Sequence, residues 1–187
     1  MAQLLKGKDI LLSNINGGTF ENDVATFCEI IIATNLDVED LFKGYYAKIE
    51  TLEYKTTFNK ECTENILNEI LELKSGHISP NVSSANLGVI STYDNEVKIK
   101  YIMRSIEEIE LENINKKSKE LQNSFEITEI YRDSIWKVNE NSNLLKEYKK
   151  LYFKEYNEYP KEEIGHGSTE VSAIKKRIDR LDVISIG

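Results

Sequence analysis

The sequence predicts an α+β protein in which an antiparallel sheet carries helices on one face, followed by a short α/β piece at its end. Three observations support this prediction. Short segments rich in Ile and Val are joined by turn residues, as in antiparallel hairpins. Between them lie stretches whose apolar residues recur at helical spacing. The last segment reads as a helix followed by an apolar strand, which is typical of α/β structure.

Composition indicates a globular protein without a charge-driven partner. The 187 residues include 24 Lys and Arg and 32 Asp and Glu, so the formal net charge is −8. The hydrophobic fraction of 40% is enough to bury a core. An acidic pI near 5.0 argues against nucleic-acid binding, which needs clustered positive charge. Because no apolar run approaches the roughly 20 residues of a membrane span and no signal peptide opens the chain, we expect no membrane partner and a cytoplasmic location.

Both cysteines lie within apolar patterns. Cys28 belongs to FCEIII, and Cys62 begins CTENIL. We therefore expect two buried free thiols in a reducing compartment.

The first half of the chain predicts a hairpin and two helices. Strands over 9–15 and 24–33 are joined through the turn residues Asn16-Gly17-Gly18, and the nearly all-apolar second strand predicts that both of its faces are covered. Asn35 or Asp37 caps a helix whose apolar stripe includes Val38, Leu41, Tyr45, Ile49 and Leu52. A second helix covers 63–74 and ends near Gly76.

A second hairpin is predicted over 86–93 and 96–104, with Asp94-Asn95 as its turn. The alternation in its second strand places Arg104 on the face away from the core. A polar helix over about 106–121 and a strand over 125–131 follow.

The pattern changes after Asp133, which predicts a domain boundary near 133–140 and hence two parts, 1–135 and 136–187. A polar linker leads into a helix with Leu144, Leu145, Tyr148, Leu151 and Tyr152 on one side. A helix over 168–180 and a short buried strand over 183–186 complete the chain.

The residues alone predict no complete active site. The two histidines, His77 and His166, belong to no Ser-His-Asp or Cys-His motif, and no phosphate-binding glycine motif is present. His166 and Glu170 are four residues apart, but two candidates do not make a zinc site. The acidic run around Glu107–Glu112 is more typical of a solvated helix start than of a cation site.

Four stretches in order resemble one enzyme family. The C-terminal segment from His166 to Gly187 is similar, without a gap, to the HAGLECGxFxxxxPGLDMISIGP segment of bacterial aminoacyl-histidine dipeptidases, also called Xaa-His dipeptidases or peptidase D. Asn16-Gly-Gly-Thr-Phe-Glu-Asn22 resembles their NGGTKDNA stretch. Val82-Ser-Ser-Ala-Asn-Leu-Gly-Val89 resembles V-x-T-S-x-N-L-G-V, and Trp136-Lys-Val-Asn-Glu-Asn-Ser-Asn-Leu144 resembles G-W-K-P-N-x-x-S-x-L.

This resemblance implies the fold of zinc-dependent, carnosinase-like enzymes. Such enzymes have a catalytic α/β domain with two zinc ions and an inserted lid domain that helps to bind substrate and contributes to dimerisation. The chain would comprise most of the lid and the end of the catalytic domain. The H-x-D metal motif, the bridging aspartate and the paired glutamates, one of them the general base, would lie outside it. We therefore expect no catalytic residue, no metal ligand and no zinc in this chain alone.

The resemblance also assigns substrate-binding residues. Asn22 falls at the lid asparagine that contacts substrate, and Arg104 falls at the lid arginine that holds the substrate's terminal carboxylate. A guanidinium matches a carboxylate with two parallel hydrogen bonds; the alternative for Arg104 is an ordinary surface arginine. Ser168 replaces the glycine of HAG, and Glu170 matches the family's glutamate.

Departures from the family pattern leave alternatives open. Ser172 replaces a second glycine, and Ala25-Thr26 replaces Pro-Arg. Ser168 is equally suited to capping the last helix, and Glu170 to its first turn. The expected function is that of a dipeptidase fragment, inactive alone. The alternatives are a self-associating module without catalysis, expected as a homodimer, and one half of a split enzyme completed by a separate chain.

Overall fold

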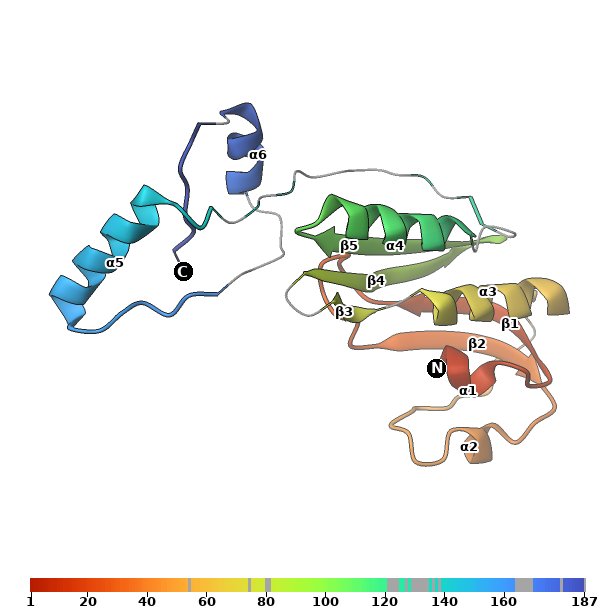
Figure 1. The fold of residues 1–187 in the computed structure, drawn as a ribbon. Helices are drawn as coiled ribbons and strands as arrows, with labels where there is room; N and C mark the ends of the chain where they lie inside the picture. Colours follow the sequence, from red (N-terminus) through yellow and green to blue (C-terminus); the bar gives the residue numbers. More distant parts are fainter. Residues whose placement is uncertain are drawn as a thin grey trace. The chain divides into compact units, whose positions relative to one another are not determined.

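The structure is a computed structural model that describes most of the chain. The residues it does not describe are 54, 74, 80–81, 121–124, 127, 129–134, 136, 138, 164–169, 179 and 187. The described residues form an α+β fold with a five-stranded sheet of strand order β2-β1-β4-β3, in which β5 also pairs with β4 (Figure 1). The predicted fold class is therefore confirmed.

The chain divides into two compact units. The first consists of Met1–Gly76, Ala85–Ile102 and Ser118–Phe125, and the second consists of His77–Ser84, Met103–Lys117 and Glu126–Gly187. The predicted division into 1–135 and 136–187 stays a prediction.

The first unit begins with a short helix and the first strand pair. α1 (Ala2–Leu5) precedes β1 (Ile10–Gly17), which pairs antiparallel with β2 (Cys28–Thr34). The predicted hairpin is confirmed, but the predicted position of its turn is wrong. Asn16 and Gly17 continue β1 and pair with Glu29 and Cys28, so a loop over 18–27 makes the connection.

Burial at β2 differs from the prediction. The strand lies at the end of the strand order, and none of its residues is fully buried, so its two faces are not both covered. Cys28, the first residue of β2, is exposed, and so is Cys62 on helix α3. Both thiols are free, but the prediction that they are buried is wrong, because one starts an outer strand and the other lies on the outer side of its helix.

The predicted helix from Asp37 to Leu52 stops after one turn. Asp37 does cap it, since its carboxylate accepts from the Asp40 backbone N–H at 3.1 Å. However, α2 covers only Val38–Leu41, and Tyr45, Ile49 and Leu52 are exposed in irregular chain. Gly44 adopts a φ of +87°, a left-handed conformation that no helix continues. This local break outweighs the helical spacing of the apolar residues.

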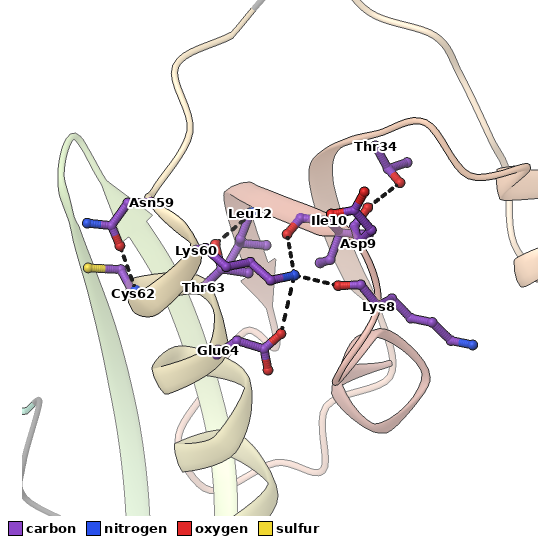
Figure 2. Close-up of polar contacts among 10 residues, drawn as sticks. All are labelled: Lys8, Asp9, Ile10, Leu12, Thr34, Asn59, Lys60, Cys62, Thr63 and Glu64. Carbon is purple, nitrogen blue, oxygen red and sulfur yellow. Dashed lines mark hydrogen bonds and ion pairs between the residues drawn. The ribbon is translucent and has the colours of Figure 1, made fainter.

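Helix α3 (Lys60–Glu72) packs beside β1 and α1 (Figure 1). It begins earlier than predicted, because Asn59 caps it by accepting from the Cys62 N–H at 2.8 Å. Figure 2 shows how its first turn is joined to β1: the ammonium of Lys60 donates to the carbonyl of Lys8 at 2.6 Å. The Thr63 hydroxyl accepts from the Leu12 N–H at 3.0 Å.

Two apolar clusters form the core of this unit. Leu5, Ile10, Phe42 and Leu67 anchor the first. The second contains Leu12, Ile15, Ile66 and Ile90, with Val97 and Ile99 packed against it. The face of α3 predicted to be inward is therefore correct at Ile66 and Leu67, whereas Leu71 is exposed.

The second hairpin is confirmed. β4 (Ser83–Tyr93) and β5 (Glu96–Ser105) flank Asp94-Asn95, and Asp94 has the positive φ of +47° typical of such turns. β3 (Gly76–Ser79) also pairs with β4. Both β4 and β5 contribute residues to each unit.

Among the described residues, three helices lie wholly or mainly in the second unit. α4 (Glu108–Glu120) and α5 (Asn143–Tyr156) confirm two predicted helices, and α6 (Glu170–Arg177) lies within the third. The predicted strand over 125–131 falls mainly outside the described residues, and Phe125, Glu126 and Thr128 are not in a strand. The predicted strand over 183–186 is wrong, because these residues are irregular, with Ser185 and Ile186 exposed. Nearby, Asp182 is instead bonded to the start of α5.

Candidate functional site

Asn22 lies in the loop over 18–27, which rests directly on β4. Gly18 has a φ of +73°, and a Cβ added to it would overlap the carbonyl of Gly88. A Cβ added to Gly88 would in turn overlap the backbone of Glu21. Glycine at both positions therefore lets the loop backbone approach the strand closely.

Polar contacts hold the same loop from both strands of the second hairpin. The side-chain amide of Asn86 on β4 donates to the Glu21 carbonyl at 2.9 Å and to the Asp23 carbonyl at 2.8 Å. The ammonium of Lys100 on β5 lies 3.7 Å from the Glu21 carboxylate. The exposed residue Asn22 is thus flanked on each side by a residue whose backbone is fixed.

Arg104 lies near the end of β5, in the second unit. Along β5, Lys98 and Lys100 are exposed and Val97 and Ile99 are half-buried, as the alternation predicts. The side chains over 101–104 are all half-buried, however, so burial does not place Arg104 on a distinct outer face. The Ser105 hydroxyl is buried and accepts from the Glu107 N–H at 3.0 Å, which fixes the chain just after Arg104.

Glu170 is the first residue of α6 and is exposed. A carboxylate in a first helical turn interacts favourably with the helix dipole. Ser168 and His166 lie outside the described residues, so their predicted roles stay predictions. Ser172, the other serine in place of a family glycine, is buried.

The predicted site residues do not form one described constellation. Asn22 belongs to the first unit, whereas Arg104 and Glu170 belong to the second. The sequence alone gives Asn86 no predicted role, although Asn86 lies in the stretch Val82–Val89 that carries part of the resemblance. Asn86 and Gly88 in that stretch were the sequence features that could have indicated a contact with the loop.

Among the described residues, no three His, Cys, Asp or Glu side chains gather as a metal-binding group. The acidic start of α4 has structural contacts instead. Glu110 accepts from the Ser83 hydroxyl at 3.3 Å, and Glu107 pairs with Lys137 at 2.8 Å. These residues do not fit a zinc centre, and the expectation that the chain holds no zinc stays a prediction.

An apolar cavity of about 170 Å³ lies in the first unit, between α3, β1 and the 18–27 loop. Ala25 and Phe27 of the loop line it, together with Ile15 and Ile70. The side chains that line it are uncharged, and Met1 at the N-terminus is among the lining residues. No helix in the described part of the chain has the length and apolarity to cross a membrane.

Comparison with known proteins identifies a structural relative. The chain is similar to the crystal structure of the aminoacylhistidine dipeptidase from Vibrio alginolyticus, with a TM-score of 0.76 and 18% sequence identity over 97% of this chain. The chain spans 44% of that structure, which is less than half of its length. No protein-family model matches the chain, and no curated protein matches it. At this identity the likeness establishes a shared fold.

Proposed function

We propose that this chain supplies the substrate-holding, lid-type part of a dipeptidase-like metallopeptidase. The reaction of the whole enzyme would be the hydrolysis of small Xaa-His-type dipeptides. The observation that carries the proposal is the fold match to an aminoacylhistidine dipeptidase over 97% of the chain. The four ordered stretches of sequence resemblance support it independently.

In this proposal, Arg104 binds the terminal carboxylate of the dipeptide. A guanidinium presents its donors in a planar fork, which suits a carboxylate. Asn22 binds a polar group elsewhere on the same substrate, and Ser168 and Glu170 contact it from the C-terminal segment.

Zinc would belong to other parts of the enzyme, where a bound ion activates water for attack on the peptide bond. Because the residues described here do not fit a zinc centre, we assign this chain no step through the metal. Its own task is to bind and orient the substrate, and we propose that the chain alone does not hydrolyse dipeptides.

The test compares Ala-His with its C-terminal amide, which lacks the carboxylate charge. The affinity of the purified chain is measured for both by calorimetry, and hydrolysis is followed with added zinc. A charge-assisted contact contributes about 1.5–3 kcal/mol, so the free acid is expected to bind at least about tenfold more tightly. Equal affinities for Ala-His and its amide would overturn the proposal. Dipeptide hydrolysis that copurifies with the chain would also overturn it.

A second candidate is a self-associating module, and the position of β2 favours it. Among the described strands, β2 is terminal in the strand order and pairs with β1, and it carries three consecutive isoleucines, Ile30–Ile32. Outer strands of this kind are templates for pairing with another chain. Light scattering at micromolar concentration is expected to give the mass of a homodimer, and a strictly monomeric mass would exclude this candidate.

A third arrangement is a split enzyme, in which a separate chain carries the metal motifs. A neighbouring reading frame that encodes H-x-D and paired glutamates would support it. Restored dipeptide hydrolysis on mixing the two purified chains would establish it, and inactivity of the mixture would count against it.

A further inference from the structure

We propose that Asn86 is a positioning residue that presents Asn22 to the substrate. This inference rests on the proposed function for the role of Asn22. The position of the loop itself does not depend on that function, since it follows from contacts within the first unit.

The side-chain amide of Asn86 makes two hydrogen bonds to the loop. An asparagine amide has two N–H donors, and here they are directed at two carbonyls, those of Glu21 and Asp23, at 2.9 and 2.8 Å. These carbonyls belong to the two residues that flank Asn22. One side chain thus fixes the backbone on both sides of the residue that would contact the substrate.

The two carbonyl acceptors determine which side chain suits position 86. The opposite orientation of the amide would direct its oxygen at two carbonyl oxygens, which is repulsive, so only the donor group satisfies this position. An aspartate has nearly the same shape but, when ionised, only accepts hydrogen bonds. The position therefore selects asparagine for its donors and not for its volume.

Two other described contacts of the loop give it less directional support than the Asn86 hydrogen bonds. The ion pair between Lys100 and Glu21 has a separation of 3.7 Å, and both side chains are largely exposed, so it contributes little. The glycine contact at Gly88 permits a close approach but supplies no hydrogen bond. Within the loop, the Asp23 N–H donates to the Phe20 carbonyl at 3.2 Å, which makes its amide a reporter of loop order.

The experiment compares Asn86→Asp with the wild-type chain. Asn95→Asp is the matched control, because it makes the same chemical change in the exposed turn between β4 and β5. Hydrogen exchange of the Asp23 amide is expected to become at least about tenfold faster in Asn86→Asp and to stay unchanged in Asn95→Asp. Protection should partly return below about pH 4, where a protonated aspartate regains one donor.

Asn86→Ala serves as a second variant in case the carboxylate prevents folding, because it removes both donors without adding a charge. Unchanged protection of Asp23 in a folded variant would overturn the positioning role. The affinity for Ala-His, measured by titration, distinguishes failure of the positioning role from failure of the proposed function. If the loop loosens and the affinity falls about fivefold or more, both proposals are supported; if the loop loosens and the affinity is unchanged, the substrate role of Asn22 is wrong.

Discussion

The hydroxyl of Thr63 accepts a hydrogen bond from the backbone N–H of Leu12 at 3.0 Å, and both residues are completely buried. Leu12 lies at the irregularity in β1 where the register with β2 shifts. Its carbonyl accepts from the Phe58 N–H at 2.8 Å, just before α3. The strand irregularity is therefore joined to the segment that leads into α3, and Leu12 at this junction belongs to the second apolar cluster.

Thr63→Val is expected to destabilise the first unit. Valine has the shape of threonine but cannot accept a hydrogen bond, so the buried Leu12 N–H loses its partner at a cost of about 1–3 kcal/mol. Urea denaturation gives the free energy of unfolding, and hydrogen exchange at Leu12 reports the local effect. The control Thr51→Val, at an exposed position, should change stability by no more than about 0.5 kcal/mol. Equal stability of Thr63→Val and the control would contradict this account of the junction.

Stability should decline at high pH through Tyr101. Burial raises the pKa of Tyr101 to about 12, above its ordinary value of 10.0. Because the folded state holds the phenol proton more tightly than the unfolded state, the contribution is fully present below pH 10 and is lost as the pH rises through about 12. Thermal unfolding between pH 9 and 12 should show a shallower decline in Tyr101→Phe than in the wild type.

The control for this prediction is Tyr93→Phe, which replaces an exposed tyrosine at the end of the neighbouring strand β4. It should retain the decline seen in the wild type. Identical slopes for the wild type and Tyr101→Phe would show that Tyr101 does not titrate as its burial requires.

Asp182→Ala is expected to loosen the start of α5. The carboxylate of Asp182 accepts from the Leu144 N–H at 2.9 Å and supplements the Ser142 cap, whose hydroxyl accepts from the Leu145 N–H at the same distance. The Leu144 hydrogen bond lowers the pKa of Asp182. Its contribution is therefore present above the ordinary value of 3.8 and is lost as the pH falls through the lowered folded value.

Hydrogen exchange at Leu144 measures this effect directly. The amide should exchange faster in Asp182→Ala at neutral pH, and also in the wild type in strong acid once intrinsic rates are subtracted. Glu158→Ala, an exposed charge removal just after α5, should leave it unchanged. Unchanged exchange in Asp182→Ala would show that Ser142 caps the helix without help.

The elements that the sequence predicts correctly are those with local signals. The β4–β5 hairpin follows from Asp94-Asn95 and the alternation beside it, and the core face of α3 follows from Ile66 and Leu67. The incorrect predictions lie at positions where the surrounding structure overrides a local sequence pattern. The spacing over 37–52 is helical, but α2 ends at Leu41, and Gly44 beyond it has a left-handed φ that prevents its continuation. Asn16-Gly17 has turn chemistry, yet Gly17 pairs with both β2 and β4.

The candidate site was predictable only in part. The resemblance selects Asn22 and Arg104, but it does not reveal what holds them. The amide of Asn86 reaches carbonyls more than sixty residues away in the sequence, and no periodicity or spacing reports such a contact. Long-range polar contacts of this kind become visible only in the folded chain.

A double comparison tests most directly the proposal that Arg104 binds the substrate's carboxylate. The affinities for Ala-His and for its C-terminal amide are measured with the wild-type chain and with Arg104→Met, which keeps much of the side-chain length but loses the charge. We expect the wild-type chain to bind the free acid about tenfold or more tightly than the amide. This preference should disappear in Arg104→Met. A folded Arg104→Met variant that retains the preference would contradict it.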